Sequence, residues 1–192
     1  SDLSVSSLEL CERAAEAVGA RNLELRRESI LAVRYADEFD MAISTGVIHH
    51  TGDPAAALAR IAAAIRPDGV VELMVYNRFH RILTSAVQKA VQLLAGPARA
   101  EGIETEMRLA GLLVEHFREP SLTRAFLDQM RGRPESMVAA TLVQPVEFSY
   151  TGESLAAMAA PSGLELLAPC PTPHDQAANR IDWSRSEEHT SE

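Results

Sequence analysis

Between residues 39 and 76, a short apolar run, an amphipathic helix and a second apolar run follow one another, and this order constrains the fold most. Phe39 to Ser44 is typical of a buried strand, and Val70 to Tyr76 is typical of the next one. Between them, Asp53-Pro54 opens a helix, with Asp as the N-cap and Pro at the first helical position, where its missing N–H costs nothing. Pro67-Asp68-Gly69 marks a turn before the second strand. This order predicts βαβ units and a parallel sheet.

Shorter segments on both sides continue the alternation. Ser4 is suited to cap a helix over residues 5–18, because its hydroxyl can accept from N–H groups of the first turn. The apolar face of that helix consists of Leu8, Cys11, Ala15 and Val18. The other expected elements are a strand at 22–27, an extended segment at 146–150, a helix capped by Thr151 and ending near Ala160, and a strand at 163–168.

Residues 79–143 differ from the rest, because they show helical periodicity and almost no strand signal. Breaks fall at Gly96-Pro97 and at Gly132-Arg133-Pro134. We therefore expect three or four helices, at about 80–95, 103–117, 121–131 and 135–142.

Composition excludes several classes of protein. The formal net charge is −9, whereas a broad nucleic-acid-binding face requires a basic surplus. No apolar run approaches the roughly 20 residues needed to span a bilayer, so no membrane association is expected. The two cysteines, Cys11 and Cys170, fit neither a disulfide framework nor a zinc-binding spacing, which makes a reducing, cytoplasmic setting the default expectation.

Candidate binding residues follow the predicted strands, because open α/β sheets bind ligands outside the carboxyl ends of their strands. Three such ends are Glu28-Ser29, Ser44-Thr45-Gly46 and Tyr76-Asn77. A fourth strand lying just before Ser1 would place Asp2 at its tip, where a carboxylate can accept both hydroxyls of a ribose. Alternatively, Asp2 is a solvated acid or a helix cap.

The loop from Ser44 to Pro54 is the most informative stretch. Its small residues let the backbone approach a ligand closely. His49 and His50 could orient a substrate or move a proton, or one of them could simply be a packing residue. A metal site is not expected, because adjacent residues point in different directions and no third ligand is spaced nearby.

The chain resembles the class I S-adenosylmethionine-dependent methyltransferases. The resemblance rests on the order of five motifs: Phe39-Asp40, Gly46-Val47-Ile48-His49-His50, Asp53-Pro54, Pro67-Asp68-Gly69 and Val70–Tyr76. Residues 1–4 resemble the end of the family's second strand, and residues 146–168 resemble its late helix and sixth strand. The resemblance implies a Rossmann-like α/β sheet.

The resemblance also implies roles for single residues. Cofactor-binding positions would be Asp2, Leu3, Glu28, Ser29, Ser44, Thr45 and Gly46, and the catalytic candidates would be His49 and His50. The family often has an acidic residue at the end of its third strand that contacts adenine. Ser29 stands there with Glu28 beside it, so either residue or a backbone group could make that contact. The family's first strand and Gly-rich loop should lie before Ser1, which predicts an N-terminally truncated fragment whose activity alone is open.

The expected organisation has three parts and a tail. Residues 1–77 and 146–184 would form the cofactor-binding core, and residues 78–145 a helical cap over the site of the methyl acceptor. Possible lining residues of this cap are Phe79, His80, Arg81, His116, Phe117 and Arg118. Residues 185–192 match the in-frame translation of a common sequencing adapter and are expected to be an artefact.

The expected function is methyl transfer from S-adenosylmethionine to a small-molecule acceptor, without a nucleic-acid or membrane partner. The sequence does not indicate the oligomeric state. Two alternatives remain open at this stage: an NAD-dependent oxidoreductase of similar fold, and a non-catalytic binding subunit that keeps the methyltransferase fold.

Overall fold

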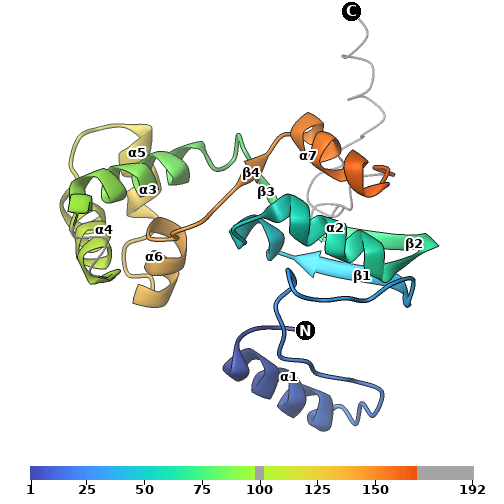
Figure 1. The fold of residues 1–192 in the computed structure, drawn as a ribbon. Coiled ribbons are helices and arrows are strands. Elements are labelled where there is room, and N and C mark those ends of the chain that lie inside the picture. Colours follow the sequence, from blue (N-terminus) through green and yellow to red (C-terminus); the bar gives the residue numbers. More distant parts are fainter. Residues whose placement is uncertain (98–101, 168–192) are drawn as a thin grey trace, which may run out of the picture.

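The computed structural model describes residues 1–97 and 102–167, and a pair of parallel strands lies at the centre of its α/β part (Figure 1). β1 (Phe39–Thr45) pairs with β2 (Ile65–Met74), and α2 (Pro54–Ala64) connects the two strands. The predicted strand–helix–strand unit and the α/β fold class are confirmed.

α2 forms where the sequence signals place it and packs through its apolar stripe. The side chain of Asp53 accepts a hydrogen bond from the N–H of Ala56 at 2.9 Å, and Pro54 occupies the first turn. Leu58 and Ile61 are buried on the inner face of the helix. They form a core cluster with Ile48, Ala57 and Ala159, against which Ile30, Ala42, Val71, Leu73, Val75, Met158 and Leu164 pack.

The turn predicted at Pro67-Asp68-Gly69 lies inside β2 as an irregularity of the ladder. Phe39 pairs with Ile65, but the next paired residues are Met41 and Val70, so β2 carries extra residues at this point. A Cβ atom on Gly69 would lie 2.9 Å from the carbonyl oxygen of Asp40. Glycine is therefore required where the two backbones approach closely.

A second small parallel sheet joins segments that are far apart in the sequence. β3 (Tyr76–Asn77) pairs with β4 (Ser149–Tyr150), and the N–H of Arg78 donates to the carbonyl of Tyr150 at 2.9 Å. α7 (Gly152–Ala159) follows β4 and begins at Thr151, as predicted. The chain therefore returns to the α/β part of the molecule directly beside the point where it left it.

The residues between β3 and β4 form four helices with a core of their own, gathered on one side of the molecule (Figure 1). These helices are α3 (Ile82–Ala95), α4 (Glu104–His116), α5 (Leu122–Asp128) and α6 (Glu135–Leu142), close to the predicted boundaries. Their shared core consists of Val87, Val91, Ala110, Val114, Leu127, Leu142 and Val143. We call these four helices the helical segment.

Two predicted strands are wrong. Residues 22–27 make only an isolated parallel bridge, between Asp2 and Arg27, and the described part of the late segment, residues 163–167, is not a strand. Of the extended segment predicted at 146–150, only the two residues of β4 form a strand. An alternating pattern becomes a strand only where a neighbouring strand offers its backbone groups, and nothing in the described residues extends these pairings.

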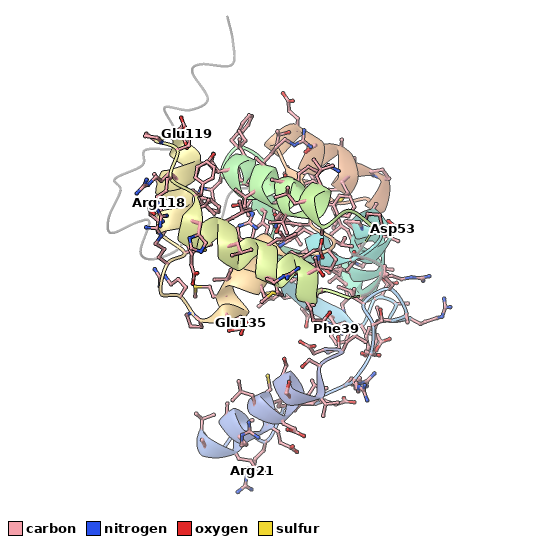
Figure 2. The ribbon with its side chains drawn as sticks, turned by 90° about the vertical axis from the view of Figure 1, so that its left-hand side faces the viewer. Arg21, Phe39, Asp53, Arg118, Glu119 and Glu135 are labelled. Atoms are coloured by element: carbon pink, nitrogen blue, oxygen red, sulfur yellow. The ribbon has the colours of Figure 1, made fainter. Side chains whose placement is uncertain are left out.

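α1 (Val5–Ala17) forms as predicted, with the Ser4 hydroxyl accepting from the N–H of Ser7, but it buries no residue. Figure 2 shows it, with Arg21 beyond its end, apart from the main body of the molecule. Within residues 1–97 and 102–167, its apolar face is therefore not part of a buried core. In the same residues, the structure has no helix that combines the length and apolar character needed to cross a membrane.

Candidate functional site

The candidate site begins where the chain leaves β1. Ser44 is buried, Thr45 is exposed, and the N–H of Gly46 donates to the carbonyl of Met74 at 3.1 Å, one residue beyond the strand. Gly46 then adopts a φ of +73°, in the left-handed region that glycine tolerates best. This residue therefore turns the chain out of the sheet and into the histidine loop.

A single 3₁₀ turn, η1 (Ile48–His50), fixes the two histidines. The Thr51 hydroxyl closes the turn by donating to the carbonyl of Ile48 at 2.7 Å. The turn buries His49 completely and leaves His50 half-buried. The ring of His49 lies 4.2 Å from that of His50 and 4.1 Å from that of Tyr76, centroid to centroid.

His49 is buried without a hydrogen-bond partner on either ring nitrogen. Among the described residues, the other buried side-chain polar atom without a partner is Oγ of Ser44. Burial, followed by the positive charge that His50 can carry, lowers the pKa of His49 from 6.5 to about 4. His49 is therefore a neutral ring near pH 7.

His50 is held by groups that follow the helical segment. Its Nδ1 lies 3.0 Å from the carbonyl oxygen of Val146 and 3.0 Å from Nε2 of Gln144. In the tautomer with Nδ1–H, the ring donates to the Val146 carbonyl and Nε2 carries the lone pair; in the other tautomer, Nδ1 accepts from the Gln144 amide and Nε2 carries the proton. The first tautomer leaves Nε2 available as a proton acceptor.

A buried ion pair lies on the other side of Tyr76. Arg81 donates to Glu147 through Nε at 2.9 Å and through Nη2 at 2.6 Å, and the Glu147 side chain is only 4% exposed. Gln88 also donates to Glu147, at 3.3 Å. The Arg81 guanidinium lies over the Tyr76 ring, 4.2 Å from its centroid. We call Arg81, Tyr76, His49 and His50 the ring stack.

The predicted cofactor-binding residues fall into two groups. Ser44, Thr45 and Gly46 lie together at the end of β1. Asp2 lies next to Glu28, whose N–H donates to the Asp2 carbonyl at 3.2 Å. No strand pairing among the described residues joins this second group to β1.

The side chains of the second group already make local contacts. Asp2 is exposed, and its Oδ1 accepts at 2.7 Å from the N–H of Ser4, the residue that caps α1. Leu3 is exposed, and Glu28 accepts from the hydroxyl of Tyr35. The Ser29 hydroxyl accepts from the N–H of Leu31 at 3.3 Å.

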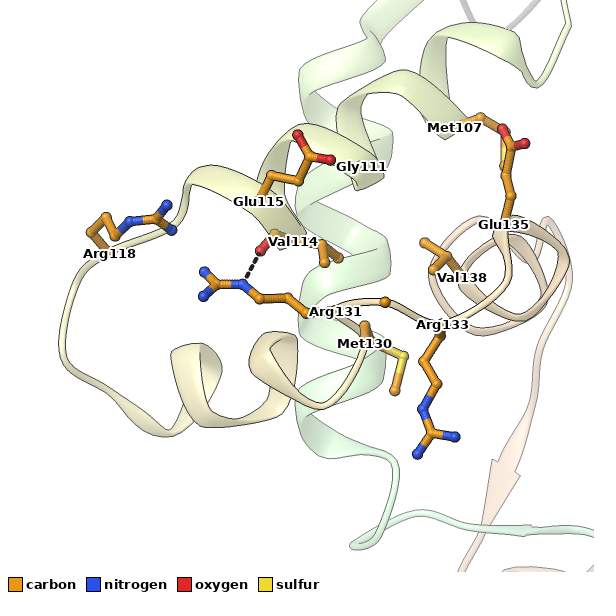
Figure 3. Close-up of a pocket in the computed structure, with 11 residues that line it drawn as sticks. Met107, Gly111, Val114, Glu115, Arg118, Met130, Arg131, Arg133, Glu135 and Val138 are labelled. Carbon is orange, nitrogen blue, oxygen red and sulfur yellow. Dashed lines mark hydrogen bonds between the residues drawn. The ribbon is translucent and has the colours of Figure 1, made fainter.

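The residues predicted to line the cap also lie in different parts of the structure. Arg81 belongs to the ring stack, and Phe79 and His80 are exposed near the start of α3. Arg118 lines a hollow in the helical segment, together with Glu115 and Arg131 (Figure 3). None of the ring-stack residues lines this hollow. His116 is exposed and Phe117 packs against the core of the helical segment. The side chains in the described residues form no cluster of three or more potential metal ligands.

A family model of the methyltransferase domain matches residues 4–132, about two thirds of the chain. The chain belongs to this family. The predicted resemblance to class I methyltransferases is confirmed, and the match favours it over the oxidoreductase alternative. An uncharacterized protein of Synechococcus sp. is 27% identical over 173 residues, which are 86% of this chain and 41% of that protein.

Solved structures show the same fold. PKMT2 from Rickettsia typhi superimposes on this methyltransferase domain with a TM-score of 0.63 at 14% identity, covering 94% of this chain and 38% of that one. PKMT2 in complex with AdoHcy gives a TM-score of 0.62 at 13% identity, covering 92% and 38%. The fold is therefore the Rossmann-like fold of methyltransferases. The chain spans about two fifths of the length of the proteins it matches.

Sequence reasoning missed three side chains of the candidate site. Tyr76 was noted only as a strand end, and Glu147 and Gln144 were not singled out. An aromatic residue at the carboxyl end of a predicted strand was a usable signal for Tyr76. Glu147 and Gln144 lie more than 90 residues from the histidine loop, and no local pattern connects them to it.

The lowered pKa of His49 should make the free energy of unfolding depend on pH. Because the folded protein disfavours protonated His49, the unfolded state binds more protons between the two pKa values. The free energy of unfolding should be at its full value above pH 6.5 and fall as the pH is lowered to about 4. His49→Phe should flatten this part of the curve, measured by urea unfolding at several pH values. His116→Gln, at an exposed ring, is the control, and an equal effect of both variants would contradict the prediction.

Breaking the buried ion pair should destabilise the methyltransferase domain strongly. Arg81→Met leaves the Glu147 carboxylate buried without its cation, which should cost about 3–5 kcal/mol in urea unfolding. The double variant Arg81→Met/Glu147→Leu should recover most of that loss, since apolar replacement of a whole buried pair is close to neutral. Arg124→Met, in an exposed pair with Asp128, should change stability by about 1 kcal/mol or less. Additive losses in the double variant would show that the pair is not the cause.

Proposed function

We propose that this protein is an S-adenosylmethionine-dependent methyltransferase acting on a small-molecule acceptor. The observation that carries the proposal is the pair of buried polar groups without partners, Ser44 Oγ and the His49 ring, just after β1. A buried polar group without a hydrogen bond costs about 1–3 kcal/mol, so native proteins keep few of them without a reason. Their position at the carboxyl end of a parallel strand is where open α/β sheets bind ligands.

The residues present fit this cofactor at both groups of predicted positions. Ser44 offers a hydroxyl that has no protein partner, and Gly46 leaves the backbone accessible beside it. Asp2 uses Oδ1 for the N–H of Ser4, which leaves Oδ2 for a ribose hydroxyl. Leu3, Glu28, Ser29 and Thr45 complete the proposed cofactor-binding set. The complex of PKMT2 with AdoHcy, on the same fold, supports this assignment.

The bound cofactor supplies an electrophilic methyl group on a sulfonium sulfur. His50 is the proposed general base for a hydroxyl acceptor: Nε2 takes the proton, and the Val146 carbonyl accepts from Nδ1–H and stabilises the ring as it becomes positive. His49 is a positioning residue, because its neutral ring packs between His50 and Tyr76 and adds no second positive charge to the site.

The proposed acceptor is a small molecule rather than nucleic acid. The chain carries a net charge of −9, so a phosphate backbone would be repelled on average. The helical segment begins and ends beside Tyr76, through β3 and β4, and is therefore placed to cover the acceptor. We place the reaction in the cytoplasm, in line with the cysteine content.

Calorimetry of the full-length gene product should show binding of S-adenosylmethionine and of AdoHcy. Ser44→Ala should weaken both, because it removes the hydroxyl that lacks a protein partner. Ser85→Ala, at an exposed position of α3, is the control. Absence of heat with both ligands would contradict the proposal. Thermal protection by a nicotinamide nucleotide instead would favour the oxidoreductase, and cofactor binding without methyl transfer would favour a binding subunit.

His50→Ala should lower turnover more than it lowers cofactor affinity. We expect a loss of roughly 10²–10⁴-fold in kcat, the usual contribution of a general base, with the Kd of AdoHcy within a few fold of the wild type. Initial rates and calorimetry on the same preparation measure the two quantities, with Ser85→Ala as an exposed control. Equal losses in turnover and affinity would assign His50 to the cofactor side of the site.

A further inference from the structure

Two groups from one short segment of chain reach the same nitrogen of His50. Its Nδ1 lies 3.0 Å from Nε2 of Gln144 and 3.0 Å from the carbonyl oxygen of Val146. Both distances are those of hydrogen bonds, but the two groups require opposite states of Nδ1. A carbonyl oxygen only accepts and requires Nδ1–H, whereas an amide NH₂ group donates and requires a lone pair on Nδ1. The ring can therefore satisfy only one of them at a time.

The chain that carries these two groups is held in place. Pro145 stands between Gln144 and Val146, and proline fixes its own φ and favours an extended backbone at the residue before it. Further along the same segment, the N–H of Phe148 donates to the carbonyl of His49 at 2.9 Å. The segment that follows α6 is therefore attached to the histidine loop through both its backbone and its side chains.

The orientation of the His50 ring is fixed as well. It stands at 83° to the ring of Tyr76, with the centroids 5.5 Å apart, and the ring of His49 lies 4.2 Å away. Within the described residues, the hydrogen bonds of the His50 ring are all made by Nδ1. In the neutral ring, the state of Nδ1 therefore decides whether Nε2 carries a lone pair or a proton.

The two partners of Nδ1 differ in whether they can change role. The Val146 carbonyl belongs to the backbone and only accepts, so a lone pair on Nδ1 would face a second lone pair at 3.0 Å. The half-buried Gln144 ends in an amide, and a half-turn of that amide exchanges its nitrogen for its oxygen at nearly the same position. With the oxygen turned toward His50, both partners accept from Nδ1–H. Both then also stabilise the ring when Nε2 takes a proton.

We propose that Gln144 is a positioning residue that sets the tautomer of His50, with its amide oxygen turned toward Nδ1–H. Gln144 and the Val146 carbonyl then share that proton, and Nε2 keeps the lone pair that a base needs. The opposite orientation of the amide places the proton on Nε2 and disables the base. This inference rests on the proposed function, because it concerns the base of the same site, but the tautomer can be measured without cofactor or acceptor.

The tautomer is read by ¹⁵N NMR of the full-length gene product labelled in its histidines, with His50→Gln to assign the signals. We expect the proton on Nδ1 in the free protein and with AdoHcy added. Gln144→Glu, whose carboxylate only accepts, should keep the proton there. Gln144→Lys, whose ammonium only donates, should shift the ratio of the two tautomers at least about tenfold toward Nε2–H. Gln129→Lys, at an exposed glutamine, is the control.

Diethyl pyrocarbonate gives a second measurement, because it reacts with the nitrogen that carries the lone pair. Gln144→Lys should slow the modification of His50 by about tenfold relative to the exposed His80, as followed by mass spectrometry of the peptides. Gln129→Lys should leave that ratio unchanged.

The wild-type tautomer decides the proposal even if a variant does not fold. A proton on Nε2 of His50 in the wild type, both free and with AdoHcy, would overturn the inference. The same tautomer ratio in Gln144→Glu and Gln144→Lys would also overturn it. Failure of AdoHcy to bind while the tautomers behave as expected would instead overturn the proposed function.

Discussion

The buried pair of Arg81 and Glu147 ties together two chain segments that are 66 residues apart. Arg81 immediately precedes α3, and Glu147 follows α6, so the pair joins both ends of the helical segment. The short ladder of β3 and β4 lies beside it and fixes the same two ends. Because the entropic cost of closing a loop grows slowly with its length, a few buried contacts at its two ends can hold the long helical segment against the α/β part.

The ion pair of Arg81 and Glu147 also determines which charges lie near the candidate site. With its charge neutralised by Glu147, Arg81 can lie over Tyr76 without attracting an anion into the helical segment. Tyr76 in turn covers His49, and this burial without hydrogen bonds is what keeps His49 neutral. His50 remains half-buried and is oriented by Val146, from the segment that Glu147 anchors. The two adjacent histidines therefore have different chemistry because their surroundings differ.

Much of the fold could be predicted because its signals are local. The Asp53 cap, the Pro54 start and the apolar stripe of α2 lie within a few turns of each other, and the helices of the segment from 79 to 143 are defined by periodicity alone. The strands predicted at 22–27 and 163–168 were wrong, within the described residues, for the opposite reason: a strand depends on a partner whose position the local pattern does not contain. The same limit applies to α1, whose apolar face has no covering partner in the described part of the chain.

The sequence by itself determined the order of strand, helix and strand, the methyltransferase family, and the histidine loop that follows β1. It also identified Arg81 as a residue of interest. Only the tertiary structure decided that Arg81 pairs with Glu147, that Tyr76 lies between Arg81 and His49, and that His49 rather than His50 is fully buried. The reason is physical: motifs and helix signals act over a few residues, whereas desolvation and the pKa of a side chain depend on contacts between segments far apart in the chain.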